Sequence, residues 1–235
     1  MDRLLVSAAS GMKTRMESLD MLANNIANTG TSGFKADREF YNLAHQELPL
    51  IQRQWTDFQQ GALLVDGNPL HMALEGQGFF AVTSPNGIVY TRSGEFQVNS
   101  QNQLATQQGY TLRNVRDNGQ PIAVDPLRPI DVDASGVVSQ NGLQVGQIEI
   151  SRINDPTSQL RKQGGSNFLL SASGGATPDG ETHIRQGALE QSNAPVNDGA
   201  VRLVSVMRQF EMLQRALAVG AEMNKQAIDQ VARVG

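Results

Sequence analysis

The side chains that could carry out acid–base or metal chemistry are few and scattered. The three histidines show no spacing typical of metal ligands; they are His45, His71 and His183. Asp131 and Asp133 could form an acid–base pair, but they lie close to Gly136 in a stretch that resembles a solvated turn. We therefore favour the turn interpretation for these two carboxylates.

Nucleotide and covalent chemistry have equally little support. Gly76 and Gly78 in "EGQGFF" lack the third glycine of a dinucleotide fingerprint, and no helical pattern follows them. No Gly-x-Ser-x-Gly motif occurs, and the chain has no cysteine, so disulfides and thiol catalysis are excluded. We expect no catalytic residue, no cofactor site and no metal site, and hence a protein that is not an enzyme.

Two aromatic residues and three asparagines leave alternatives open. Trp55 and Phe58 lie in the polar stretch "QRQWTDFQQG" and could form a sugar platform, although a local core or an interface anchor is the more usual role. Asn24, Asn25 and Asn28 lie close together in a helical pattern, where asparagine is unfavourable. Their amides either mark a helix end in water or form hydrogen bonds at helix–helix contacts in an assembly.

The helix that would carry these asparagines is predicted from Asp2 to about Asn28. Its apolar residues recur at alternating steps of four and three, which is the narrow seam of a coiled coil. Gly30 and Gly33 mark its end. The seam consists of Leu5, Ala9, Met12, Met16, Leu19, Ala23 and Ile26.

A second helix of the same kind is predicted from about Asn197 to Val234, with Asp198 as a plausible N-cap. Its seam contains one polar residue, Asn224, a position at which asparagine fixes register in coiled coils. The seam runs through Leu203, Val206, Phe210, Leu213, Leu217, Gly220, Asn224, Ala227, Val231 and Val234.

The segment between the helices, residues 59–192, has the pattern of an antiparallel β domain. Asn-Gly pairs at 86–87, 118–119 and 141–142 suit tight hairpins, and short β-branched or apolar runs flank them. Residues 154–183 are rich in Gly, Ser and Pro, so we expect mainly loop there, with "NFLL" as a short strand.

Together these patterns predict a mainly β fold with terminal α-helices. The two helices pair as a coiled-coil-like stalk, and the β domain is inserted between them. Such a pair leaves further apolar residues uncovered, which indicates packing against helices of other copies. The uncovered residues include Leu4, Met21, Leu22, Val204, Met207 and Val219.

Composition excludes several other classes of protein. The net charge is -4 with a pI near 5.4, and no Lys/Arg-rich run suggests a nucleic-acid partner. No apolar run approaches the ~20 residues that cross a bilayer, so no membrane insertion is expected. The first residues do not resemble a cleaved signal peptide, since Lys13, Arg15 and Glu17 interrupt the apolar stretch.

Four stretches resemble motifs of the bacterial flagellar rod and hook family. "LANNIANTGTSGFKADR" is similar to its N-terminal signature, and "QGALEQSNAPVNDGAVRLVSVMRQFEMLQRA" to its C-terminal one. "QQGALLVDGNPLHMALEGQGFFAV" and "YTRSGEFQVNSQNQLATQQGYTL" resemble the start of the family's β domain and the hairpin after it. His71 departs from an acidic position of the family, and Leu217 from an aromatic one.

The resemblance implies a structural subunit of the flagellar basal-body rod, exported through the flagellar type III channel and assembled helically into the hollow shaft across the periplasm. Its partners would be copies of itself, other axial rod and hook proteins, and the export apparatus. The short segment between Phe40 and Gln59 favours a proximal over a distal rod protein. The alternatives from other classes are a cell-wall carbohydrate-binding module and, third, a polysaccharide-cleaving enzyme.

We expect residues 1–35 and 197–235 to form the axial helical domain and residues 36–196 the β-rich outer domain. The interface between subunits is expected to follow the helix seams and the asparagines. Its predicted residues are Leu5, Met12, Leu19, Asn24, Asn25, Ile26, Asn28, Leu203, Val206, Phe210, Leu213, Leu217 and Asn224.

Overall fold

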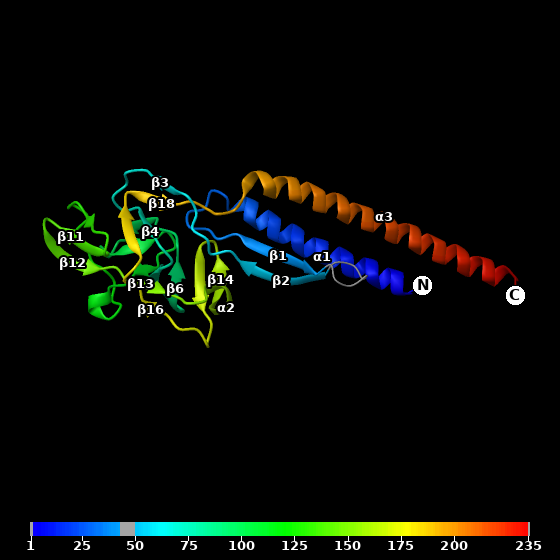
Figure 1. The fold of residues 1–235 in the computed structure, drawn as a ribbon, viewed down its shortest axis with the longest axis horizontal. Coiled ribbons are helices and arrows are strands. Elements are labelled where there is room, and N and C mark those ends of the chain that lie inside the picture. Colours follow the sequence, from blue (N-terminus) through cyan, green and yellow to red (C-terminus); the bar gives the residue numbers. More distant parts are fainter. Residues whose placement is uncertain (1, 43–49, 235) are drawn as a thin grey trace. The chain divides into compact units, whose positions relative to one another are not determined.

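The chain is mainly β, with one long helix at each end, as the sequence predicts (Figure 1). The computed structural model describes the backbone of residues 2–42 and 50–234, and side chains within 9–39, 54–195, 198–223 and 225–226. Helix α1 spans Asp2–Ala27 and helix α3 spans Val196–Val234. His45 and the side chains of Leu5 and Asn224 lie outside the described parts.

Two compact units make up the chain. The first contains α1, α3 and a hairpin of strands β1 (Asp37–Asn42) and β2 (Leu50–Thr56). The second contains residues 28–36 and 57–193. The sequence-based boundary after residue 35 assigned this hairpin to the β-rich part. In the structure α1 holds β1, because the Ser18 hydroxyl donates to Glu39 at 2.8 Å and Asn25 bonds the backbone of Asp37.

The second unit is built from short antiparallel strands. The largest sheet has the order β14-β15-β6-β5-β9-β8-β7, with β13 beside β5 and β16 beside β13. Three small sheets, β10-β11-β12, β17-β4 and β18-β3, complete the unit. The strands are β3 (Leu63–Val65), β4 (Met72–Glu75), β5 (Phe79–Ser84), β6 (Gly87–Thr91), β7 (Phe96–Val98), β8 (Leu104–Thr106), β9 (Thr111–Leu112), β10 (Asp131–Val132), β11 (Val137–Gln140), β12 (Leu143–Gln147), β13 (Ile150–Arg152), β14 (Leu160–Gly164), β15 (Asn167–Leu170), β16 (Thr177–Pro178), β17 (His183–Gln186) and β18 (Ala188–Glu190); the short helices are η1 (Val115–Asp117) and α2 (Pro156–Gln159).

Alternation of apolar and polar residues gives this unit two apolar clusters. The larger one gathers Phe80, Leu104, Ile122 and Ile148 with further buried aliphatic residues. The smaller one surrounds Phe79 and Phe168, whose side chains point to the other face of the sheet. Neighbouring residues of one strand, Phe79 and Phe80, therefore belong to different clusters, as expected for a sheet that is covered on both faces.

The turns follow the sequence prediction in part. Asn141 and Gly142 join β11 and β12 with φ values of 52° and 75°, the backbone that a two-residue Asn-Gly hairpin turn requires. Residues 154–183 contain more regular structure than expected. "NFLL" forms β15, as predicted, but it pairs with β14, whose polar residues give no apolar alternation.

Candidate assembly site

Helices α1 and α3 share an apolar cluster within the first unit. Met21, Leu22 and Val206 are buried, with exposed fractions of 8%, 4% and 8%, and Leu19 and Leu203 pack against them. Met21 and Leu22 were expected to lie uncovered, and this expectation is wrong. An α-helix repeats every ~3.6 residues, so its buried stripe drifts away from a strict seven-residue seam.

The other predicted seam residues are less covered. Five of them are half-buried: Met12, Ile26, Phe210, Leu213 and Leu217. Ala9, Met16 and Ala23 are exposed, Met16 to 54%, so the prediction that these three lie on a covered seam is wrong within the single chain. The structure therefore brings Leu19, Leu203 and Val206 together within one chain. A role for these positions between subunits stays a prediction.

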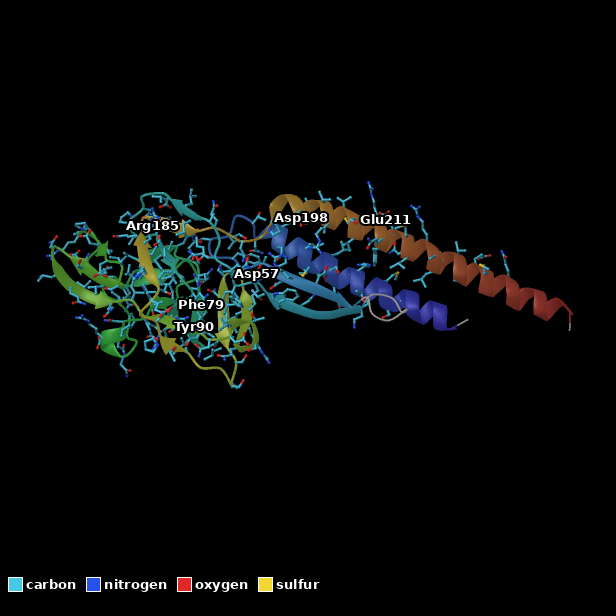
Figure 2. All side chains as sticks on the ribbon, viewed as in Figure 1. Asp57, Phe79, Tyr90, Arg185, Asp198 and Glu211 are labelled. Carbon is cyan, nitrogen blue, oxygen red and sulfur yellow. The ribbon has the colours of Figure 1, made fainter. Side chains whose placement is uncertain are left out.

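Helix α3, whose described side chains Figure 2 draws as sticks, also carries large apolar residues that are exposed. At 100° per residue several of them form a stripe on one face of the helix, roughly opposite the face that carries Val206 and Phe210. Arg208 and Arg215 lie on the same face. The stripe, as we call it below, consists of Val201, Val204, Met212, Val219 and Met223. Its N-terminal part borders an open apolar groove of about 640 Å³.

The three asparagines differ in what their amides do. Asn25 is buried, its Nδ2 donates to the carbonyl of Asp37 at 2.8 Å, and its Oδ1 accepts from the Asp37 amide at 2.9 Å. Asn28 Oδ1 accepts from the hydroxyl of Thr31 at 3.1 Å, and Asn24 is exposed. The amide of Asn25 therefore fixes strand β1 against its own helix.

A buried group of charges lies in the second unit. Lys35 Nζ donates to Glu190 Oε1 at 2.5 Å, and Arg92 Nη1 donates to Glu190 Oε2 at 3.2 Å. Burial lowers the pKa of Lys35 and of Arg92, while Glu190 opposes both shifts. Two cations thus share one carboxylate, and Arg92 also lies over the ring of Phe79, 5.0 Å from its centroid.

Glu190 and Asn193 bond two other stretches of chain. Glu190 also accepts from the amide of Gly61 at 2.9 Å, and its carbonyl accepts from the amide of Gly33 at 2.7 Å. Asn193 Oδ1 accepts from the amide of Ala36 at 2.7 Å. Its Nδ2 donates to the carbonyls of Asp57 and Gln59 at 2.7 and 3.0 Å. We call Lys35, Glu190 and Asn193 the clamp.

Two glycines permit the close backbone contacts around the clamp. A Cβ on Gly61 would lie 2.0 Å from the carbonyl oxygen of Gln191. A Cβ on Gly33 would lie 2.2 Å from the backbone of Arg92, and Gly33 has a φ of 64°. Sequence reasoning did not assign the clamp a role, although its residues lie in the quoted motifs, because no local pattern links positions 155 residues apart.

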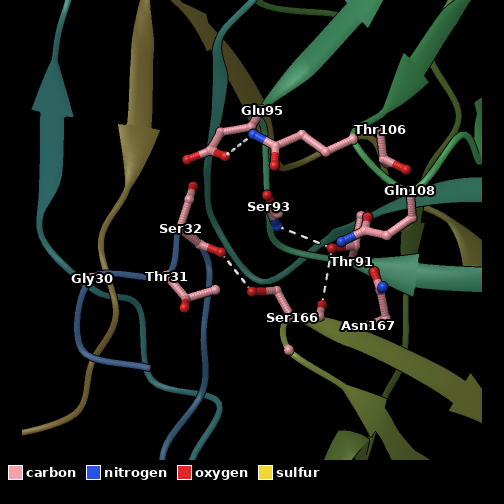
Figure 3. A pocket seen from close by; sticks show the side chains of 12 residues that line it. Gly30, Thr31, Ser32, Thr91, Ser93, Glu95, Thr106, Gln108, Ser166 and Asn167 are labelled. Atoms are coloured by element: carbon pink, nitrogen blue, oxygen red, sulfur yellow. Dashed lines mark hydrogen bonds between the residues drawn. The ribbon is translucent and has the colours of Figure 1, made fainter. Parts of the chain in front are cut away.

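A polar hollow of about 280 Å³ also lies in the second unit (Figure 3). Hydroxyl and amide groups line it, and Glu95 is its charged residue. Much of the lining is already bonded, since Ser166 donates to the carbonyl of Ser32, Thr91 donates to the carbonyl of Ser166, and Gln107 donates to Glu95. No aromatic residue is among those that line the hollow.

The other residues that were considered for chemistry have local structural roles. Asp133 accepts from the amides of Ser135 and Val137, which confirms the turn interpretation for this residue. For Asp131 the interpretation is wrong, because it lies in strand β10 and pairs with Ser139. The amide of Gly78 donates to the Thr182 hydroxyl, and Gly78 directly precedes strand β5, as expected for a turn that leads into a strand. Phe58 packs against Phe79 and Phe168 at ring distances of 5.7 and 5.1 Å, which confirms the local-core role for this residue.

Within the described residues, no group of three or more His, Asp or Glu side chains is placed to hold a metal ion. Neither long helix, over the part that the structure describes, carries an apolar stretch sufficient to cross a membrane.

Comparison with known proteins decides the family. Residues 5–35 match the family described as flagella basal body rod protein, residues 73–150 the flagellar hook protein FlgE/F/G D1 domain, and residues 185–230 the C-terminal region of flagellar basal body rod FlgEFG proteins. The flagellar basal-body rod protein FlgF of Caulobacter vibrioides is 30% identical over 248 residues, covering 100% of both chains. The chain belongs to the flagellar basal-body rod protein family.

Other rod proteins are similar over almost the same length. FlgG of Borreliella burgdorferi is 30% identical, with 95% of this chain and 96% of the relative covered. FlgF of Mesorhizobium japonicum is 29% identical, with 97% and 96% covered. The three matched regions cover most of α1, the central strands and most of α3, and the clamp residues Lys35 and Glu190 fall in the first and last of them.

Proposed function

We propose that this protein is a non-catalytic structural subunit of the flagellar rod, which assembles with copies of itself and with other rod and hook proteins. The observation that carries the proposal is the exposed stripe on α3. One face of α3 packs on α1 through Val206 and Leu203, while the opposite face leaves Val201, Val204 and Val219 exposed.

An exposed apolar stripe of this length is unfavourable in a protein that stays monomeric. In the proposed rod, neighbouring subunits cover it, and the two helices form a coiled-coil-like stalk whose outer faces are completed by other copies. A contact between two different surfaces of identical subunits does not close on itself and produces a helical filament. This is the geometry that a shaft requires.

We further propose a division of labour along the chain. Residues 1–35 and 197–235 form the axial domain that builds the inner wall, and residues 36–196 form the outer domain with the inserted β strands. We place the subunit in the proximal part of the rod, with a distal position as the second choice, because the segment from Phe40 to Gln59 is short.

Export through the flagellar type III channel, without a cleaved signal peptide, belongs to the same proposal, as does a final location in the periplasmic part of the basal body. The absence of cysteine supports it, since no disulfide can trap the chain in an oxidising compartment.

The experiment expresses variants at two neighbouring residues of α3, Val219 and Ala218, in a strain whose own copy of the gene is deleted. Val219 is 60% exposed and lies on the stripe, whereas the exposed Ala218 lies on another face of the helix. We expect Val219→Asp to leave the unfolding temperature of the purified protein unchanged, because the residue is exposed in the single chain, and to abolish rods and swimming.

Ala218→Asp is the matched control, because it introduces the same charge at the same height of the helix. We expect strains with this variant to build rods and swim. Normal rods in the Val219→Asp strain would contradict the proposal that the stripe is covered in the assembly.

A further inference from the structure

Three stretches of chain meet at the clamp, all within the β-rich unit. The first is residues 33–36, the second is residues 57–61, and the third is residues 190–193. The unit's two segments end at residues 28, 36, 57 and 193, and each of the three stretches lies directly next to one of the last three of these ends. The clamp therefore gathers three of the four points where the chain enters or leaves the unit.

The bonds form a closed set among the three stretches. The first and third are joined by Lys35 to Glu190, by Gly33 to the Glu190 carbonyl, and by Ala36 to Asn193. The first and second are joined by the ammonium of Lys35 to the carbonyl of Gln59 at 2.7 Å, and by the amide of Asp57 to the carbonyl of Ala36 at 2.8 Å.

The second and third stretches complete the set. Asn193 Nδ2 donates to the carbonyls of Asp57 and Gln59, and the amide of Gly61 donates to Glu190 Oε1 at 2.9 Å. Each stretch is thus bonded to both others. Lys35 and Glu190 are fully buried, and charge-assisted bonds in such a place are strong and short.

We propose that the clamp is a mechanical joint, which holds the chain ends of the β-rich unit rigidly so that force passes through them without local opening. The proposal rests on the proposed function, because a rod subunit transmits torque. The clamp carries no assembly surface in this assignment. Its residues act by positioning the chain ends, so their loss is expected to leave subunit contacts in place and to soften the subunit.

Asn193→Ala tests the joint on the purified full-length protein by hydrogen exchange. The change removes three side-chain bonds, and Asn99→Ala is the matched control because half-buried Asn99 also forms three side-chain bonds elsewhere in the unit. We expect amides in 33–36 and 57–61 to exchange about tenfold faster in Asn193→Ala, the effect of losing one or two net hydrogen bonds, while β5 and β6 stay unchanged. In Asn99→Ala, 33–36 and 57–61 are expected to exchange as in the wild type.

The same variants are then placed in the deletion strain. We expect Asn193→Ala strains to build rods but to lose swimming speed in viscous medium, where torque is highest, and Asn99→Ala strains to match the wild type. Unchanged exchange at 33–36 and 57–61, or wild-type speed at every viscosity, would overturn the joint.

Asn193→Asp serves if the alanine variant does not fold. It keeps an acceptor for the Ala36 amide and loses the donor to the carbonyls of Asp57 and Gln59, so we expect faster hydrogen exchange at 57–61 alone. An equal change in exchange rate throughout the β-rich unit would contradict the proposal. Failure of the wild-type gene to restore rods would reject the rod function instead, and the exchange results do not depend on that outcome.

Discussion

Glu190 is a residue whose carboxylate neutralises part of a buried charge and whose carbonyl anchors a second segment. Its side chain is fully buried and balances two cations, one of which, Arg92, has a buried Nε that finds no hydrogen-bond partner among the described residues. A buried ion pair adds little to stability compared with a well-packed apolar pair, but loss of one partner leaves an uncompensated charge.

We therefore expect Glu190→Ala to lower the free energy of unfolding of the β-rich unit by about 3–5 kcal/mol, because Lys35 and Arg92 would stay buried without their carboxylate. Chemical denaturation followed by circular dichroism measures the change. The control is Glu75→Ala, which breaks an exposed pair with Arg185 and is expected to cost about 0–1 kcal/mol. Equal effects of the two substitutions would contradict the assigned role.

Asp179 is expected to make the stability of the folded protein depend on pH. Burial alone raises the pKa of Asp179, but hydrogen bonds from the Thr182 hydroxyl and from the amides of Glu181 and Thr182 hold it below its usual value of 3.8. A carboxyl with a lowered pKa in the folded state adds stability above its unfolded pKa, and this is lost as the pH falls through the folded value.

Asp179→Asn should consequently reduce stability at neutral pH, and the difference from the wild type should shrink as the pH falls below 3.8. Denaturation curves over this range measure it. A difference that stays constant with pH would show that the charge of Asp179 does not contribute.

At the scale of single elements, Asn25 bonds helix α1 to strand β1, as Ser18 also does. Replacing Asn25 by Ala would favour the helix by a few tenths of a kcal/mol but leave the amide and carbonyl of Asp37 without their partner, at about 1–3 kcal/mol. We expect faster hydrogen exchange at Asp37. Asn24→Ala, with the same gain in helix propensity at an exposed position, should leave Asp37 unaffected.

A substitution in helix α3 tests whether the two units unfold independently. Phe210 lies half-buried on the face of α3 that carries Val206. Phe210→Asp would place a carboxylate where an aromatic ring packs, and losing such a ring costs about 3–5 kcal/mol in a fully packed site. We expect the calorimetric unfolding midpoint of the β-rich unit to stay nearly unchanged while swimming is lost. A large fall in that midpoint would refute the separation of the units.

Sequence periodicity was sufficient for the long elements and insufficient for the short ones. The helix predicted from Asp2 to about Asn28 matches α1, and the helix predicted from about Asn197 to Val234 matches α3. Apolar residues at regular steps indicate a helix whatever its surroundings. Strand β14 was missed because Arg161, Lys162 and Gln163 show no apolar alternation, and its pairing depends on β15.

The clamp could not be predicted for a different reason. Lys35 and Glu190 each look like an ordinary surface charge in the sequence, and only the folded chain brings them together. The seam residues Leu19 and Val206 were predicted to be apolar contacts, and the structure shows them packed within one chain. Their contribution to contacts between subunits is a matter of the whole assembly, which one sequence does not determine.

At the scale of the whole molecule, the two units differ in how much of their surface is covered. The β-rich unit has large apolar clusters, whereas α3 beyond Leu217 has exposed side chains at most of its described positions. We expect limited proteolysis of the monomer to shorten both terminal helices and to leave a resistant fragment that contains the β strands. Mass spectrometry of the fragments measures it, and uniform cleavage along the chain would argue against this difference.

The sequence separation between Lys35 and Glu190 also has a kinetic consequence. Contacts between residues this far apart form slowly, because a long loop must close before they contribute. During synthesis from the N-terminus, Lys35 has no carboxylate partner until nearly all of the chain except α3 has left the ribosome. We therefore expect the last step in folding the β-rich unit to wait for its final strand, and a nascent chain to stay open until then.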